Sequence, residues 1–168
     1  MIRAIGPATH TVMSMGDLRA AAVAAGLENV RTLLATGNLL FEAAGREVDI
    51  RRTLEGIVGD FGLTNEVFVR QPEEIVATIE ANPFPLAAAR RLNHLLVLFL
   101  HRMPSREALD RLAGYEGPEH ARVVGREVFI DYVEGVGRSK LTAAVLERRL
   151  GLTGTARNWN TVGKLLQG

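Results

Sequence analysis

Apolar and polar residues follow helix and strand periods in an order that occurs twice along the chain. The first 70 residues predict six elements in turn: a strand at 1–5, a helix over 14–26, strands at 30–35 and 38–42 around a turn, a helix over 49–61 and a strand at 65–70. The turn carries Thr36-Gly37, where glycine supplies the backbone freedom that a tight hairpin needs. Two helices on one face of a small antiparallel sheet would bury the apolar side of these strands.

The second part of the chain repeats that order. It predicts a strand at 93–100, a helix over 105–113, strands at 121–124 and 127–132, a helix over 140–150, a brief strand at 153–157 and a last helix over 159–167. Residues 93–100 are apolar on both faces, which predicts a central strand. Strand, helix, strand, strand, helix, strand is the order of a ferredoxin-like unit. The leading prediction is therefore an α+β protein made of two tandem ferredoxin-like halves.

The clearest break between the halves is Asn82-Pro83-Phe84-Pro85, because two prolines prevent regular hydrogen bonding there. It follows a helix predicted from Pro72 to Ala81. We predict domains at 1–82 and 83–168, the second with an extra C-terminal helix. The alternative is a single mixed α/β sheet that merges both sets of strands.

Composition excludes several classes of protein. The net charge is +1 at pH 7, so the whole molecule has no electrostatic preference for nucleic acid or a membrane. The absence of cysteine excludes a disulfide framework and a thiolate metal site. No apolar run approaches the roughly 18–20 residues of a membrane-spanning helix. We expect a cytoplasmic protein that does not contact a membrane.

The strongest candidate site is the polar run near the C-terminus, which contains the only tryptophan and one of only two lysines. Arg157, Asn158 and Asn160 stand at the predicted start of the last helix, where backbone N–H groups and the helix dipole favour an anion. The alternative is structural: Asn158 caps the helix and Trp159 anchors it in the core. Pattern alone favours the structural reading.

A glycine-rich turn at 135–140 supplies a second cationic segment. Its backbone N–H groups could hold an anion, with Arg138 and Lys140 supplying charge and Ser139 between them. The turn lacks the spacing of a phosphate-binding loop, and the alternative is a flexible turn that leads into a helix capped by serine. Since ligands often bind between domains, we predict a small anionic or nucleotide-like ligand in a cleft between the halves. Arg3 and Asn38 would reach it from the first half.

Several short strings resemble a bacterial family, the domain of unknown function 1697. They are Met15-x-x-Leu18-Arg19, Gly26-Leu27-x-Asn29-Val30-Arg31-Thr32, Thr36-Gly37-Asn38-Leu39-Leu40-Phe41, Asn82-Pro83-Phe84, Ser139-Lys140-Leu141 and Arg157-Asn158-Trp159-Asn160-Thr161-Val162-x-Lys164-Leu165. The segment 3–10 departs from the Arg-Gly-Ile-Asn start typical of the family, so we expect a shortened first strand. The resemblance implies a cytoplasmic α+β protein without assigned chemistry, and it transfers no catalytic residue.

Two other functions compete with ligand binding. Nucleic-acid binding would use the sheet faces and the arginine pairs at 51–52, 90–91 and 148–149, but these pairs are predicted to be solvated and only 5% of residues are aromatic. An enzyme would use Lys140 or His10 as a base, yet no nucleophile, base and orienting group stand together in the sequence. His94 and His101 are seven residues apart on one strand and face opposite ways, so we expect no metal site. We expect no cofactor.

Overall fold

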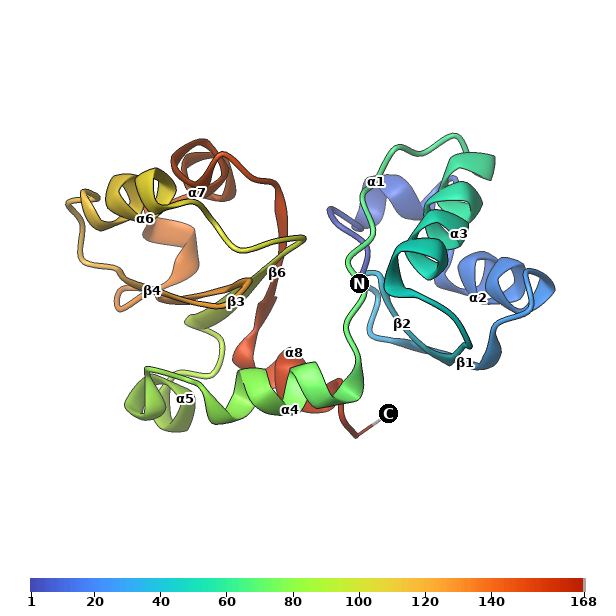
Figure 1. Cartoon of the computed structure of the whole chain (residues 1–168), viewed down its shortest axis with the longest axis horizontal. Helices are drawn as coiled ribbons and strands as arrows, with labels where there is room; N and C mark the ends of the chain where they lie inside the picture. Colours follow the sequence, from blue (N-terminus) through green and yellow to red (C-terminus); the bar gives the residue numbers. More distant parts are fainter. Residues whose placement is uncertain (168) are drawn as a thin grey trace. The chain divides into compact units, whose positions relative to one another are not determined.

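The computed structural model describes residues 1–167 as a mixed α+β fold with two separate antiparallel sheets (Figure 1). The chain forms two compact units, Met1–Gln71 and Pro72–Leu166. The first unit contains α1 (Pro7–His10), α2 (Met15–Ala24), β1 (Glu28–Leu33), β2 (Asn38–Glu42) and α3 (Glu47–Asp60). The second contains α4 (Pro72–Glu80), α5 (Pro85–Arg90), β3 (Leu95–Leu100), α6 (Arg106–Ala113), β4 (His120–Val124), β5 (Glu127–Asp131), a short 3-10 helix η1 (Val136–Arg138), α7 (Ala143–Leu150), β6 (Gly154–Asn158) and α8 (Trp159–Lys164).

In the first unit, α2 and α3 pack on one face of the β1–β2 hairpin. The start of α2 is fixed by a capping box, in which Ser14 Oγ accepts from the Asp17 backbone N–H and the Asp17 carboxylate accepts from Ser14. The core between these elements is formed by aliphatic side chains from both helices, both strands and the segments that flank them: Ile2, Ile5, Met13, Leu18, Ala22, Leu27, Val30, Leu39, Ile50, Leu54, Ile57, Val58, Val67 and Val69. Its location confirms the apolar stripes that predicted both helices.

The two outer strands predicted for this unit, 1–5 and 65–70, are reduced to the single bridge Ile2–Val67. Their backbones are still joined, because Phe68 N–H donates to the Met1 carbonyl at 2.7 Å and Arg3 N–H donates to the Glu66 carbonyl at 2.9 Å. Ala4 has a φ of 54°, and α1 begins at once at Pro7, so the chain leaves the strand conformation after three residues. The strand prediction was therefore wrong in length.

The second unit has the strand order β4-β5-β3-β6, with β3 in the interior of the sheet as predicted. Figure 1 shows α6 and α7 on one face of this sheet and α4, α5 and α8 on the other. Leu98, Leu100 and Ile130 pack towards α6 and α7, whereas Phe129 lies against Trp159 of α8 with ring centroids 6.4 Å apart. Both faces are therefore covered by helices.

Several predictions change in the light of these elements. Two sheets replace the single merged sheet, so that alternative was wrong. The helix predicted over 140–150 begins only at Ala143, because Thr142 Oγ1 accepts from the Val145 N–H and acts as its cap. Helix α4 belongs to the second compact unit, and the predicted domain division at 82 and 83 stays a prediction. None of the helices within residues 1–167 has the length and apolarity to cross a bilayer.

Candidate functional site at one end of the second sheet

Four strands of the second unit start or stop at the same end of the sheet. Leu95, at the start of β3, pairs with Asp131, at the end of β5, and Asp131 pairs with His120, at the start of β4. Leu96 pairs with Asn158, the last residue of β6. We call this region the sheet end. The loop after β5, which carries the glycine-rich turn, and the start of α8 both leave the sheet from here.

Asn158 caps the N-terminus of α8, as the structural alternative for the C-terminal motif predicted. Its Oδ1 accepts from the Thr161 backbone N–H at 2.9 Å, and its backbone is extended as a cap requires. The next residue ties the turn to the chain before β3, because Trp159 N–H donates to the Leu92 carbonyl at 3.1 Å. Asn160 is exposed on the first turn of α8. Of these amides, the exposed Asn160 is therefore the better placed to meet a ligand.

Arg157 is a buried cation, with only 8% of its surface exposed. Its Nη1 donates to Thr155 Oγ1 and to the Ala156 carbonyl, both at 2.8 Å. Burial lowers the pKa of its guanidinium to about 10, because a charged group loses the solvation of water in the interior. The sequence identified this residue as a cation of interest but did not reveal that it is buried.

The loop that carries Ser139 and Lys140 is fixed to the sheet at both ends. Gly135 N–H donates to the Tyr132 carbonyl at 2.8 Å, and the Tyr132 hydroxyl donates to the Leu141 carbonyl at 2.9 Å. Ser139 Oγ accepts from the Leu141 N–H at 2.9 Å, so Ser139 shapes the loop and does not cap α7. Lys140 is exposed.

Glu119 links this loop to the start of β4. The Tyr115 hydroxyl donates to Glu119 Oε2 at 2.9 Å, and the Ser139 side chain helps to lower the pKa of the same carboxylate. Burial by itself raises the pKa of Glu119, but hydrogen bonds from Ser139, from its own backbone and from Tyr115 outweigh burial and hold the pKa below its usual value. Burial, followed by the charges of Glu119 and Tyr115, raises the pKa of Tyr132 to about 12.

The lowered pKa of Glu119 predicts a loss of stability in acid. A carboxyl with a lower pKa in the folded state stabilises the fold above its unfolded pKa of about 4.3, and this stabilisation is lost as the pH falls through the folded value. Between about pH 5 and pH 3, the wild type should therefore lose more unfolding free energy than Glu119→Gln, as measured by urea unfolding. Glu116→Gln, at an exposed neighbour, should follow the wild type. Equal acid sensitivity of the Glu119 variant and the wild type would contradict the assignment.

An ion pair that the sequence did not reveal also lies at the sheet end. Arg91 Nη2 donates to Asp131 Oδ2 at 2.6 Å, and the Asp131 side chain is only 6% exposed. Arg91 Nε and Asp131 Oδ1 are buried without a hydrogen-bond partner within the described chain, as is His94 Nδ1. Arg91 follows α5 and Asp131 ends β5, 40 residues later, so their contact is a tertiary feature that the sequence pattern does not reveal.

Arginine pairs that the sequence assigned to solvated faces are more structured than predicted. Arg91 joins the ion pair above, and the Arg149 guanidinium lies 5.3 Å from the centre of the Tyr115 ring. Arg111 Nε donates to the Arg149 carbonyl at 2.8 Å, and Arg149 Nη1 donates in return to the Arg111 carbonyl. These two arginines satisfy carbonyls at the ends of α6 and α7. The prediction of solvated pairs was wrong for Arg91 and Arg149.

The remaining predicted site residues belong to the first unit. The Arg3 carbonyl accepts from Asn65 Nδ2 at 2.8 Å. Asn38 is fully buried, and its Nδ2 donates to the Leu33 carbonyl at 3.0 Å and to Thr36 Oγ1 at 3.1 Å. Asn38 therefore braces its own hairpin turn, as an asparagine in a turn often does. His10 Nε2 is 2.8 Å from the Ala35 carbonyl, which joins the N-terminal loop to the same turn.

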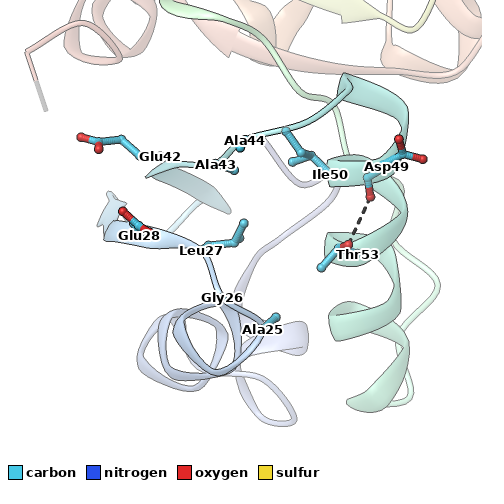
Figure 2. Close-up of a pocket in the computed structure, with 10 residues that line it drawn as sticks. All are labelled: Ala25, Gly26, Leu27, Glu28, Glu42, Ala43, Ala44, Asp49, Ile50 and Thr53. Atoms are coloured by element: carbon cyan, nitrogen blue, oxygen red, sulfur yellow. Dashed lines mark hydrogen bonds between the residues drawn. The ribbon is translucent and has the colours of Figure 1, made fainter.

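The first unit also contains a cavity that sequence reasoning missed. Its volume is about 560 Å³, and it lies between the ends of β1 and β2 and the start of α3 (Figure 2). Its lining is Ala25, Gly26, Leu27, Glu28, Glu42, Ala43, Ala44, Asp49, Ile50 and Thr53. No predicted site residue is among them. Within residues 1–167, no group of three or more His, Asp or Glu side chains could hold a metal ion.

The two compact units and their separate antiparallel sheets define the protein as a mixed α+β fold. The family described as protein of unknown function (DUF1697) matches residues 1–129, and this chain belongs to that family. The conserved bacterial protein SP0830 from Streptococcus pneumoniae has a similar structure, with a TM-score of 0.74 and 20% sequence identity over 99% of this chain and 94% of that chain. At that identity the likeness establishes the fold alone. No curated protein matches this chain.

Proposed function

We propose that this protein binds a small anionic or nucleotide-like ligand at the sheet end of its second unit. The observation that carries the proposal is the strand register, by which β5 and β6 flank β3 and both finish at the same end of the sheet. The glycine-rich loop follows β5, and the C-terminal motif follows β6. Two cationic segments that are distant in sequence therefore leave the sheet at the same end.

The proposed contacts have different roles. The exposed Lys140 amine supplies charge, and the exposed Asn160 amide supplies hydrogen bonds. Asn158 and Ser139 hold the two segments in place through the backbone bonds described above. Arg157, in β6 just before α8, adds a buried positive charge, whose effect on an anion is less screened than that of a surface cation. Contributions from Arg3 and Asn38 stay predictions.

We further propose that both units are variants of the ferredoxin-like arrangement. In the second unit, β3, α6, β4, β5, α7 and β6 follow each other in the chain, and the sheet order β4-β5-β3-β6 supports this description. In the first unit, Ile2 N–H donates to the Gly37 carbonyl at 2.7 Å, so residues 1–3 adjoin the turn of the β1–β2 hairpin. The bridge from Ile2 to Val67 continues the same order on the other side.

Binding through the sheet end is tested by a thermal-shift screen of phosphate, pyrophosphate and nucleoside phosphates. We expect at least one of them to raise the melting temperature of the wild type by a few degrees and to raise that of Lys140→Gln by less than half as much. Lys164→Gln removes the only other lysine and is the matched control, so it should respond like the wild type. Equal responses of the two lysine variants would overturn the proposed site.

The nucleic-acid alternative finds less support. Phe129 of β5 is fully buried, and Tyr132, the residue after β5, is 4% exposed. Neither ring therefore offers a stacking surface for a base. In the thermal-shift screen, a response to single-stranded RNA but to none of the small phosphates would favour that alternative and remove the small-ligand proposal.

A further inference from the structure

We infer that the cavity of the first unit binds a small aliphatic molecule that carries no negative charge. This site is distinct from the sheet end, and the inference does not rest on the proposed function. The cavity volume of about 560 Å³ falls in the range of small-molecule sites.

The cavity arises from the way in which the hairpin ends. The last strand pair is Glu28–Glu42, after which β2 leads through Ala43 and Ala44 towards α3. On the other side, α2 ends at Ala24, and Gly26, with a φ of 87°, turns the chain sharply into β1. The helix start and the strand ends therefore diverge, and a space remains between them.

The floor of this space is aliphatic. Figure 2 shows the Leu27 side chain reaching from the strand ends and the Ile50 side chain reaching from α3 towards the same space. Both residues belong to the core of the first unit and are 8% exposed. The small side chains of Ala25, Ala43 and Ala44 leave the entrance open. An alkyl chain placed here would extend the existing core, which stabilises the complex by removing apolar surface from water.

The charge around the cavity determines which molecules can enter. Three of its residues are acidic and none is basic. Asp49 is paired with Arg46 at 2.7 Å and with Arg52 at 3.4 Å, but Glu28 and Glu42 stand directly opposite each other across the strand pair. Figure 2 shows the carboxylates of Glu28 and Glu42 directed away from α3, so they do not fill the space. Their charge nevertheless repels an anion near the entrance.

The inference is tested by NMR titration of the full chain with two probes of equal chain length, 1-hexanol and hexanoate. We expect 1-hexanol to shift the backbone amides of Leu27, Ala43 and Ala44 saturably, and hexanoate to bind about ten-fold more weakly. Ala43→Trp should fill the space and abolish the shifts. Ala89→Trp, at an exposed position of α5, is the control and should leave them unchanged.

The contribution of the Glu28 and Glu42 carboxylates is tested by a double variant. In Glu28→Gln with Glu42→Gln, the preference for 1-hexanol over hexanoate should fall to about two-fold or less. Glu134→Gln, at an exposed position in the second unit, should keep the wild-type preference. Shifts with neither probe would overturn the cavity as a binding site, and equal affinity of the wild type for both probes would overturn the exclusion of anions. Neither outcome bears on phosphate binding near Lys140.

Discussion

Replacing Gly37 with alanine should lower the free energy of unfolding by about 3 kcal/mol, the larger of two expected effects on stability. Gly37 has a φ of 74°, which an alanine adopts only with strain. A Cβ atom at this position would also lie 2.6 Å from Ile5 Cγ1 and 3.0 Å from the Ile2 carbonyl oxygen. Urea unfolding measures the change.

Gly125 provides a matched control for this experiment, because it occupies the turn of the β4–β5 hairpin. Its φ of 59° imposes the same backbone strain, but the nearest atom to a new Cβ is Glu127 Oε2 at 3.7 Å. Gly125→Ala should therefore cost only about 1 kcal/mol. If both variants lose a similar free energy of unfolding, the close packing of Gly37 on Ile5 does not contribute to the effect of Gly37→Ala.

Replacing Arg91 with methionine should lower the free energy of unfolding by about 2 kcal/mol, because it leaves the buried Asp131 carboxylate without its partner. The effect is smaller than for a fully buried pair, since the Arg91 side chain is 35% exposed. Arg90→Met, one residue earlier and exposed, is the control and should change stability by less than about 0.5 kcal/mol.

A double variant separates the ion pair from other effects of the substitution. In Arg91→Met with Asp131→Leu, both charges are gone, and at least half of the lost stability should return because no uncompensated charge stays buried. If the double variant is less stable than Arg91→Met alone, the loss arises from packing and the ion pair does not explain it.

Sequence periodicity was sufficient for the local elements of this fold. The alternation around Gly37 and around Gly125 predicted both hairpins, and the apolar run before Leu100 predicted the interior strand of the second sheet. These predictions succeed because burial on one or both faces of a strand leaves a direct pattern in the sequence. The resemblance to the family was also confirmed, although the match covers only residues 1–129.

Features that depend on tertiary structure could not be predicted in this way. The start of α7 was placed at Lys140 because Ser139 is a good cap, but the residue that caps this helix is Thr142. The ion pair of Arg91 with Asp131 joins the segment after α5 to the end of β5, which are distant in sequence. The cavity beside Leu27 and Ile50 depends on how the connection from α2 to β1 diverges from the connection from β2 to α3. The periodicity of the sequence does not predict this divergence.

For the candidate site, the sequence identified residue types but not their exposure. Arg157 and Asn158 were identified together, yet the first is buried and the second caps α8. Lys140 and Asn160 are exposed. A run of polar residues does not distinguish these cases, because hydrogen bonds within the fold and contacts with a ligand require the same side chains.

The central claim, that one anion contacts both segments at the sheet end, is tested most directly by an NMR titration with pyrophosphate. The account predicts that the backbone amides of Lys140 and Leu141 and those of Asn160 and Thr161 shift together, with one dissociation constant. Lys140→Gln should weaken the response of both segments. Shifts confined to one segment, different dissociation constants for the two segments, or no shifts at all would contradict it.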